Sequence, residues 1–96
     1  RPADDHLPYT ISKAALAALT QSLAVALAPS ITVNGIALGA ILPPADGGDA
    51  EAAIKDVPAG RWARAEEVSW ALIFLLEGAG YTTGEILHVD GGRHLI

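Results

Sequence analysis

Tyr9 and Lys13 are the two residues of this chain whose types and spacing could carry out a reaction. They stand four positions apart at the start of an apolar segment, and positions i and i+4 lie on one helix face, one turn apart. A free tyrosine has a pKa of about 10. A neighbouring ammonium and the positive N-terminal end of a helix both favour the tyrosinate and lower that pKa. A tyrosine so placed could give a proton to a substrate oxygen or take one from it.

The same spacing also arises by chance, so the elements around the pair matter. A loop is expected over Arg1–Pro8, and a helix from about Tyr9 to Ala28, ended by Pro29. The helix is indicated by apolar residues at spacings of three and four, namely Leu16, Leu19, Leu23 and Leu27. The short apolar run Ile31–Ala37 is rich in β-branched residues and predicts a strand buried on both faces.

The second half of the chain continues this alternation. A loop over Gly39–Gly48 precedes a short helix that Asp49 could cap and that ends at Lys55 or Asp56. After a connection over Pro58–Arg64, a helix is expected over Ala65–Glu77, with an apolar stripe of Val68, Ala71, Leu72, Leu75 and Leu76 and with Gly78 at its end. A last strand fits Ile86–Val89. This order predicts an α/β fold with a parallel sheet, and because two strands make no stable sheet, other strands are expected elsewhere.

From Ala14 to Ala45 the sequence has no ionisable side chain. A helix without a charged face is buried on more than one side. A membrane span is the alternative, but Thr20, Gln21 and Ser22 lie in its middle and alanine replaces leucine elsewhere. Burial between the sheet and a second subunit fits better.

The composition narrows the class of protein. The formal net charge is −5 and no Lys/Arg cluster occurs, so nucleic acid is not an expected partner. A membrane is not expected either, because polar residues interrupt the uncharged helix. The absence of cysteine excludes disulfides and thiol chemistry and fits a cytoplasmic location. The chain has no methionine and begins at Arg1, so we expect it to be part of a longer protein.

Four segments in order resemble the short-chain dehydrogenase/reductase family. Tyr9 to Leu16 resembles the family's active-site helix, and Ile31 to Gly39 resembles the strand and turn that follow. Arg61-Trp62 with Glu66-Glu67-Val68 is similar to the opening of the next helix, and Thr83 to Gly92 is similar to the closing segment. Together they cover nearly the whole chain.

The resemblance implies the fold and the cofactor. It implies the C-terminal part of a Rossmann-like, doubly wound parallel sheet in three α/β/α layers, with residues 1–96 as the C-terminal portion of one NAD(P)-binding domain. The N-terminal cofactor-binding half, with the glycine-rich loop and the catalytic serine, would precede Tyr9, so the 96-residue chain alone is expected to be inactive. The cofactor would be NAD(P)(H), with the choice between NAD and NADP undetermined.

The resemblance also assigns roles. Tyr9 would be the general acid/base, and Lys13 would lower its pKa and hydrogen-bond the nicotinamide ribose. Leu38, Gly39 and the backbone of Ile41 would lie beside the nicotinamide. The substrate would be a small carbonyl or alcohol, and the partners would be the N-terminal part of the same protein and further copies in a homodimer or homotetramer.

Two departures from the family pattern affect these roles. Leu38-Gly39 replaces the usual Pro-Gly, and Pro43 stands where a threonine is usual, so the carboxamide and phosphate contacts of that position are in doubt. Pro43-Pro44, the Ala28–Ile31 turn and the Leu-Gly turn resemble the pteridine-reductase-like branch. The alternative to an enzyme is a non-catalytic homologue that acts as a ligand-binding or assembly module.

Several other polar residues are expected to be structural. Asn34, in a buried strand, should hold the neighbouring loop, and Asp90 should stabilise a turn. Gly78-x-Gly80-x-x-x-Gly84 follows a helix and precedes a strand, so it predicts a turn and not a dinucleotide loop. The spacing of His6, His88 and His94 is not that of metal ligands. Core or interface packing is expected for Trp62 and Trp70.

Overall fold

The structure, a computed structural model, describes residues 2–39 and 54–96, apart from the side chains of residues 2–6 and 9. The chain divides into two compact units, Arg1–Gly35 with Tyr81–Ile86, and Ile36–Gly80 with Leu87–Ile96. Each unit is described by itself. The described elements follow in the order α1 (Pro2–Leu27), β1 (Gly35–Leu38), α3 (Ala65–Ile73), η1 (Phe74–Gly78), β2 (Ile86–Val89) and η2 (Arg93–Leu95).

Helix α1 begins at Pro2, seven residues before the expected start, so the prediction of a loop over Arg1–Pro8 is wrong. Pro8 lies inside the helix, where it lacks an N–H and costs one backbone hydrogen bond. The preceding turn is compatible with a helix, since Pro2 suits its first position and Asp4 and Asp5 suit its positive end. The predicted end is confirmed, because α1 stops at Leu27, two residues before Pro29.

Small residues form the packed face of α1. Thr20 and Ala24, one turn apart, are 6% and 3% exposed, and the Thr20 hydroxyl donates a hydrogen bond to the Leu16 carbonyl at 2.8 Å. Within the same unit a Cβ added to Gly84 would lie 3.5 Å from the Cβ of Ala24, and one added to Gly35 would lie 3.9 Å from the Thr20 hydroxyl oxygen. Glycine therefore lets the backbone of residues 35 and 84 approach the helix closely.

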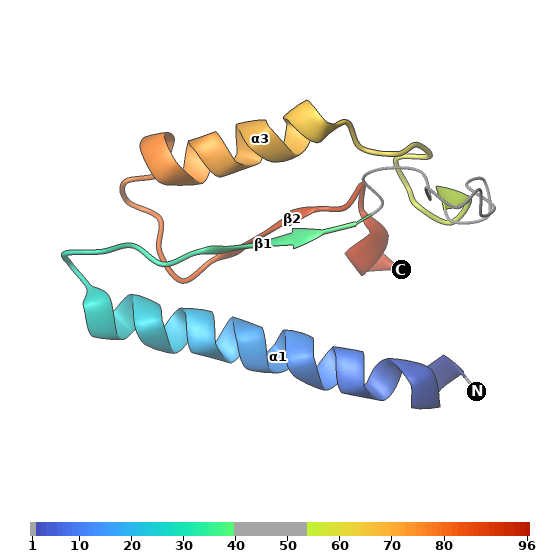
Figure 1. Cartoon of the computed structure of the whole chain (residues 1–96), viewed down its shortest axis with the longest axis horizontal. Coiled ribbons are helices and arrows are strands. Elements are labelled where there is room, and N and C mark those ends of the chain that lie inside the picture. The colour runs from blue at the N-terminus through green and yellow to red at the C-terminus, as the bar shows by residue number, and fades with distance from the viewer. Residues whose placement is uncertain (1, 40–53) are drawn as a thin grey trace. The chain divides into compact units, whose positions relative to one another are not determined.

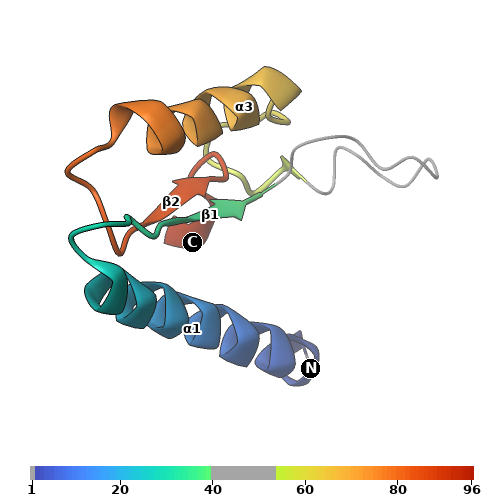
Figure 2. The same ribbon diagram turned by 60° about the vertical axis from the view of Figure 1, so that its left-hand side comes forward.

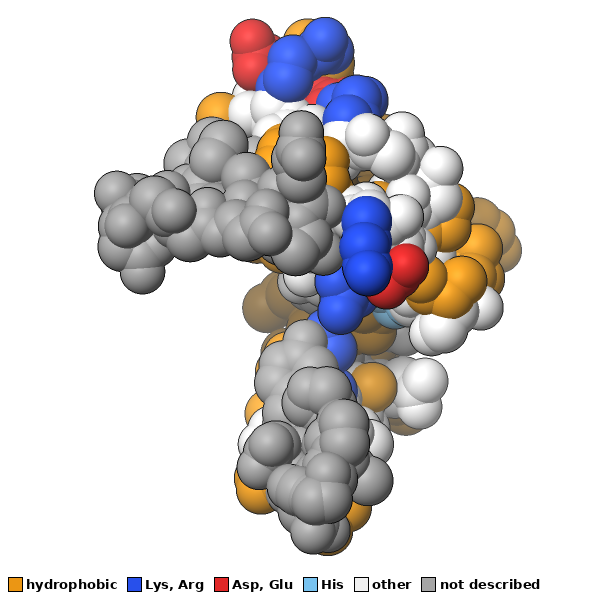
Figure 3. Space-filling view, turned by 90° about the vertical axis from the view of Figure 1, so that its right-hand side faces the viewer, with side chains coloured by type: hydrophobic (Ala, Val, Ile, Leu, Met, Phe, Trp, Pro, Cys, Tyr) orange, Lys and Arg blue, Asp and Glu red, His pale blue; other side chains and the backbone are white. Residues whose placement is uncertain are grey.

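The other side of α1 exposes apolar side chains. More than half of the surface of Ile11, Leu16 and Leu19 is exposed, and 80% of that of Val25. The expectation that this helix is buried on more than one side is therefore not met within the described chain, and any cover must come from outside it. By length and composition alone Thr10–Leu27 could cross a membrane, a test that the core helix of a soluble protein also passes. Figure 3 shows hydrophobic side chains at the surface on the face that it presents.

Strands β1 and β2 form a two-stranded parallel sheet, which confirms the α/β class (Figures 1 and 2). The register is constant, since Gly35 N–H donates to the Glu85 carbonyl at 2.9 Å and Gly39 N–H to the Val89 carbonyl at 3.1 Å. The bounds predicted for the last strand, Ile86–Val89, are confirmed. The expected burial of this strand on both faces is not met within the described chain, since Ala37 is the buried residue of β1 and Leu38 is 49% exposed.

The first strand starts later than predicted, because side chains replace the sheet hydrogen bonds before Gly35. The Asn34 amide donates to the Thr82 carbonyl at 3.0 Å and accepts from the Glu85 N–H at 3.0 Å. The Val33 N–H donates to the Thr83 hydroxyl at 3.0 Å. The prediction that Asn34 holds the neighbouring loop is confirmed, and so is the turn over residues 78–84.

Helix α3 starts at the predicted residue, Ala65, but its last turn is wider than an α-helix. From Phe74 to Gly78 it continues as a π-helical turn, η1, so the predicted end near Glu77 holds although the local geometry differs. Val68, Ala71 and Leu75 are half-buried as the stripe predicted, whereas Leu72 and Leu76 are 48% and 75% exposed. The stripe is thus narrower than the sequence indicated.

The predicted loop and short helix between the two halves fall mostly outside the described residues. Of the short helix expected up to Lys55 or Asp56, the structure describes helical Ile54 followed by a turn. Pro43 and the other residues from 40 to 53 are not described. The predicted connection over Pro58–Arg64 is confirmed.

Candidate active site

Tyr9 and Lys13 both lie on α1, so the helical spacing that the sequence indicated is present. Their backbone positions are one turn apart on the same face of a continuous helix. Lys13 is exposed and takes part in an interaction of its own. The prediction that the positive end of the helix lowers the pKa of Tyr9 is wrong. Because α1 begins at Pro2, Tyr9 lies beyond the first turn, where the positive end of the helix has little effect.

Leu38 and Gly39 lie at the carboxyl end of β1, next to the carboxyl end of β2. In open α/β sheets ligands bind in the crevice outside the carboxyl ends of the parallel strands. Leu38 is half exposed there, and the Gly39 N–H is held by the Val89 carbonyl. Ile41, the third residue expected beside the cofactor, lies outside the described residues. Tyr9 and Lys13 belong to one compact unit and Leu38 and Gly39 to the other, so the candidate site is described in two parts.

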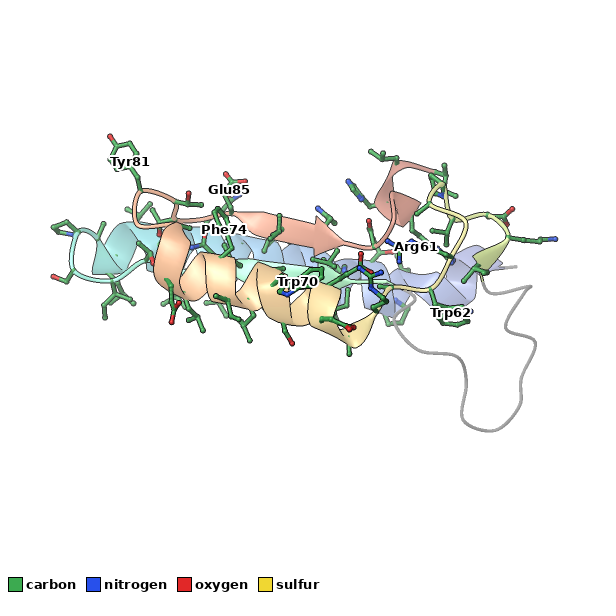
Figure 4. All side chains as sticks on the ribbon, turned by 90° about the horizontal axis from the view of Figure 1, so that it is seen from above. Arg61, Trp62, Trp70, Phe74, Tyr81 and Glu85 are labelled. Carbon is green, nitrogen blue, oxygen red and sulfur yellow. The ribbon has the colours of Figure 1, made fainter. Side chains whose placement is uncertain are left out.

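A bidentate ion pair that the sequence reasoning did not single out fixes the start of α3. The Arg61 guanidinium donates to both carboxylate oxygens of Glu67, at 2.9 and 2.8 Å, and also to the Trp62 carbonyl at 3.0 Å (Figure 4 labels Arg61 and Trp62). The same carboxylate accepts the Arg64 N–H at 2.8 Å, which satisfies an otherwise unpaired donor at the helix start. The six-residue separation of Arg61 and Glu67 gives no helical signal, because Arg61 precedes the helix.

The two tryptophans have different surroundings. Trp62 is half-buried in the connection before α3, whereas Trp70 is 58% exposed on the helix. The Arg64 guanidinium lies 5.8 Å from the centre of the Trp70 ring, within the range of a cation–π contact. Within the described chain Trp62 is therefore packed, as predicted, whereas Trp70 lies at the surface.

Asp90 directly follows β2 and is the turn residue that the sequence predicted. Burial opposes ionisation of its carboxyl, but hydrogen bonds from the Gly92 N–H and from the ring and N–H of His94 outweigh burial and hold the pKa of Asp90 below its ordinary value of 3.8. A hollow of about 220 Å³ lies beside it, lined by Ala59, Arg61, Ala63, Glu67, His88, Val89, Asp90 and Gly91. Among the described side chains, those of residues 7–39 other than Tyr9 and of residues 54–96, no three acidic or histidine groups lie together as metal ligands would.

The hydrogen bonds to Glu67 predict a stability that falls in acid. The Arg61 side-chain hydrogen bond, followed by the Arg64 N–H, lowers the pKa of Glu67 from 4.5 to about 2. Because the folded pKa lies below the unfolded one, the stabilisation is complete above pH 4.5 and is lost as the pH falls towards 2. We expect Glu67→Gln to flatten this part of the pH dependence, measured as the urea midpoint of the complete protein over a pH series. Glu66→Gln is the matched control, and equal slopes for Glu67→Gln and the wild type would contradict the prediction.

Comparison with known proteins places these features in a family. A family described as enoyl-(acyl carrier protein) reductase matches residues 1–94. The chain is 46% identical over 90 residues to carbonyl reductase family member 4 of Danio rerio, covering 92% of this chain and 38% of that protein. It is also similar to the crystal structure of a short chain dehydrogenase from Bacillus anthracis, with 35% identity, a TM-score of 0.74, and coverage of 90% of this chain and 36% of the other. The chain belongs to the short-chain dehydrogenase/reductase family.

The family membership also confirms the fold class. FolM alternative dihydrofolate reductase 1 from Brucella canis, solved in complex with NADP, is 40% identical with a TM-score of 0.78, over 92% of this chain and 34% of that one. The solved structures that this chain resembles have the Rossmann-like fold that the sequence predicted. This short-chain dehydrogenase/reductase chain spans about two fifths of the length of the curated relatives it matches.

Proposed function

We propose that the complete protein containing this chain is an NAD(P)(H)-dependent oxidoreductase that interconverts a carbonyl and an alcohol, with Tyr9 as general acid/base. The observation that carries the proposal is the placement of Tyr9 and Lys13 one turn apart on the continuous helix α1 of a short-chain dehydrogenase/reductase chain. Relatives named as a carbonyl reductase and as dehydrogenases support the reaction class.

The chain's own residues would handle the proton. During reduction the Tyr9 hydroxyl would donate its proton to the substrate oxygen as a C–H bond forms at the carbonyl carbon, and during oxidation the tyrosinate would take it back. The ammonium of Lys13, one turn along α1, favours the tyrosinate electrostatically. When bound, the nicotinamide cofactor supplies or accepts the hydride.

The carboxyl end of β1 fits a nicotinamide cofactor. Asp90 fills the direction that a Gly39 side chain would take, so Gly39 offers only its backbone there, and Leu38 beside it presents an exposed apolar surface. We propose that Leu38 and Gly39 lie against the nicotinamide, with the Ile41 backbone at its carboxamide and Lys13 at the ribose. Pro43 has neither a hydroxyl nor an N–H, so it contributes no hydrogen bond from these groups to the cofactor. Both NADH and NADPH stay candidates, and a cytoplasmic location stays a prediction.

A pteridine-type substrate is a second candidate. FolM, named as an alternative dihydrofolate reductase, is one of the similar solved structures. The sequence features that suggest this branch are Pro43-Pro44, the Ala28–Ile31 turn and the Leu38-Gly39 turn. Dihydrofolate therefore belongs in any substrate panel beside simple ketones and aldehydes.

The proposed function is tested by following oxidation of NADH and of NADPH by the complete protein with such a panel. Turnover with at least one substrate is expected. A complete protein that binds neither cofactor and reduces no substrate would instead be the non-catalytic homologue.

The exposed apolar side of α1 supports assembly, and we propose that it packs against a second copy, with alanines where the helices cross. Ala18 is exposed on the side of α1 opposite Thr20 and Ala24. Ala18→Glu places a carboxylate in this contact and is expected to shift the complete protein to a smaller assembly in light scattering after gel filtration. Ser30→Glu adds the same charge beyond the helix and should leave the assembly unchanged. A folded Ala18→Glu variant with the wild-type assembly would place the interface elsewhere.

A further inference from the structure

The turn after β2 is held by one carboxylate. Gly91 and Gly92 have φ of 64° and 92°, which glycine adopts readily. The Asp90 carboxylate accepts the Gly92 N–H at 3.0 Å and the His94 N–H at 3.1 Å. The His94 ring nitrogen Nδ1 lies 3.1 and 2.9 Å from the two carboxylate oxygens. Asp90 and His94 therefore fix the shape of residues 90–94.

His94 is itself held against the strand. Its ring stacks on the ring of His88 in β2, with centroids 3.8 Å apart and 14° between the planes. The Asp90 carboxylate is only 9% exposed, so the His94 contact covers a charge that water reaches poorly. Removing the ring would break the stacking contact and leave Asp90 with one donor fewer.

This turn contacts the chain at two separate places in the same compact unit. On one side is Gly39, where an added Cβ would lie 2.7 Å from both the Cα and the Cβ of Asp90. On the other side the Ala59 N–H donates to the Gly91 carbonyl at 2.9 Å, and an added Cβ at Gly91 would lie 2.8 Å from a Val57 methyl carbon. Gly39, which follows β1, and the segment Val57–Ala59 therefore both contact the turn at residues 90–92.

We infer that Asp90 and His94 are positioning residues, which act through the turn to hold Gly39 and the segment Val57–Ala59 in place at the carboxyl end of the sheet. The inference rests on the proposed function, since Gly39 is there expected beside the nicotinamide. Neither Asp90 nor His94 is assigned a contact with the cofactor. Their effect on cofactor binding arises because Gly39 shifts when the turn loosens.

The test uses the complete protein with His94→Ala, His94→Asn and Asp90→Asn. We expect His94→Ala to raise the Kd for the cofactor that the wild type binds by about tenfold, because a site that is no longer held in place must be ordered when the cofactor binds. His94→Asn keeps a side-chain donor near Asp90 and should recover part of the affinity. Asp90→Asn removes the charge that binds three donors and should weaken binding at least as much as His94→Ala. Arg93→Ala, one position before His94, is the matched control and should bind like the wild type.

Amide hydrogen exchange supplies a readout that does not depend on activity. In His94→Ala, exchange should accelerate at Gly39 and Ala59, whose N–H groups bond to Val89 and Gly91, but not at Glu67, whose N–H bonds to Arg64. A variant that melts earlier while its folded fraction keeps wild-type affinity and exchange would make the role merely structural and overturn the inference. If the wild type binds neither NADH nor NADPH, the proposed function fails and the inference falls with it. If the wild type binds and His94→Ala binds equally well, only the inference fails.

Discussion

Tyr9→Phe is expected to reduce the turnover of the complete protein by about 10²- to 10⁴-fold, the usual contribution of a positioned acid or base. The substitution removes only a hydroxyl, and phenylalanine has a helix propensity similar to that of tyrosine, so α1 should be retained. Folding, judged by the melting curve, and the Kd for the cofactor should therefore stay close to those of the wild type. The measurement is kcat with one good carbonyl substrate at saturating cofactor.

Tyr81→Phe is the matched control for this prediction. Tyr81 is fully exposed in the turn before β2, as the stick view in Figure 4 also shows, so loss of its hydroxyl should leave kcat unchanged. Near-normal turnover by Tyr9→Phe would mean that another group supplies the proton. The role of Tyr9 would then be wrong, whether or not the protein is a reductase.

Lys13→Ala is expected to lower turnover to a similar extent and also to weaken cofactor binding. Without the ammonium the tyrosinate loses its neighbouring positive charge, and the proposed contact with the ribose is lost as well. Lys13→Arg keeps the charge but replaces a compact ammonium by a planar guanidinium, so poor rescue is expected. The measurement is a pair of values, kcat and the Kd for the cofactor, for each variant.

Lys55→Ala removes the same type of side chain from an exposed turn and is the control for a change in net charge. The kcat and the cofactor Kd of Lys55→Ala should match those of the wild type. A Lys13→Ala variant with reduced kcat but unchanged Kd would confine Lys13 to the proton step. One with both values unchanged would remove it from the site.

The elements near strong local signals could be predicted from the sequence. The strand Ile86–Val89 has its predicted bounds because a short, mostly apolar run with a β-branched residue at each end lies between a Thr-Gly turn and Asp90-Gly91-Gly92. The role of Asn34 followed from the requirement that a polar amide between apolar neighbours find partners, and it has them at Thr82 and Glu85. Such features depend on a few adjacent residues and on one physical rule.

Other features depend on the balance between opposing local preferences or on contacts between residues far apart in the chain. Pro8 predicts the end of a loop, but the loss of one backbone hydrogen bond does not stop α1, which runs through it. The pair Arg61–Glu67 joins a loop to a helix, and its sequence separation matches no regular element. The contact of Gly39 with Asp90 joins residues far apart in the chain, which no local pattern specifies.

The candidate site divides in the same way. The spacing of Tyr9 and Lys13 was enough to predict their shared helix face, since α1 is regular through both. The link from Asp90 and His94 to Gly39 needed the structure, although the i,i+4 spacing of Asp90 and His94 was present in the sequence. The turn made by Gly91 and Gly92, and not an α-helix, brings these two together.

The most direct test of the proposed function is hydride transfer itself. The complete protein is incubated with NADH or NADPH deuterated at the transferable position and with a substrate panel of ketones, aldehydes and dihydrofolate. The products are analysed by mass spectrometry. We expect deuterium on the reduced carbon with the wild type and with Tyr81→Phe, and at least about a hundredfold less with Tyr9→Phe. If the wild type transfers no deuterium from either cofactor to any substrate, or if Tyr9→Phe transfers it at the wild-type rate, the account of this chain as the Tyr9-dependent part of an oxidoreductase is contradicted.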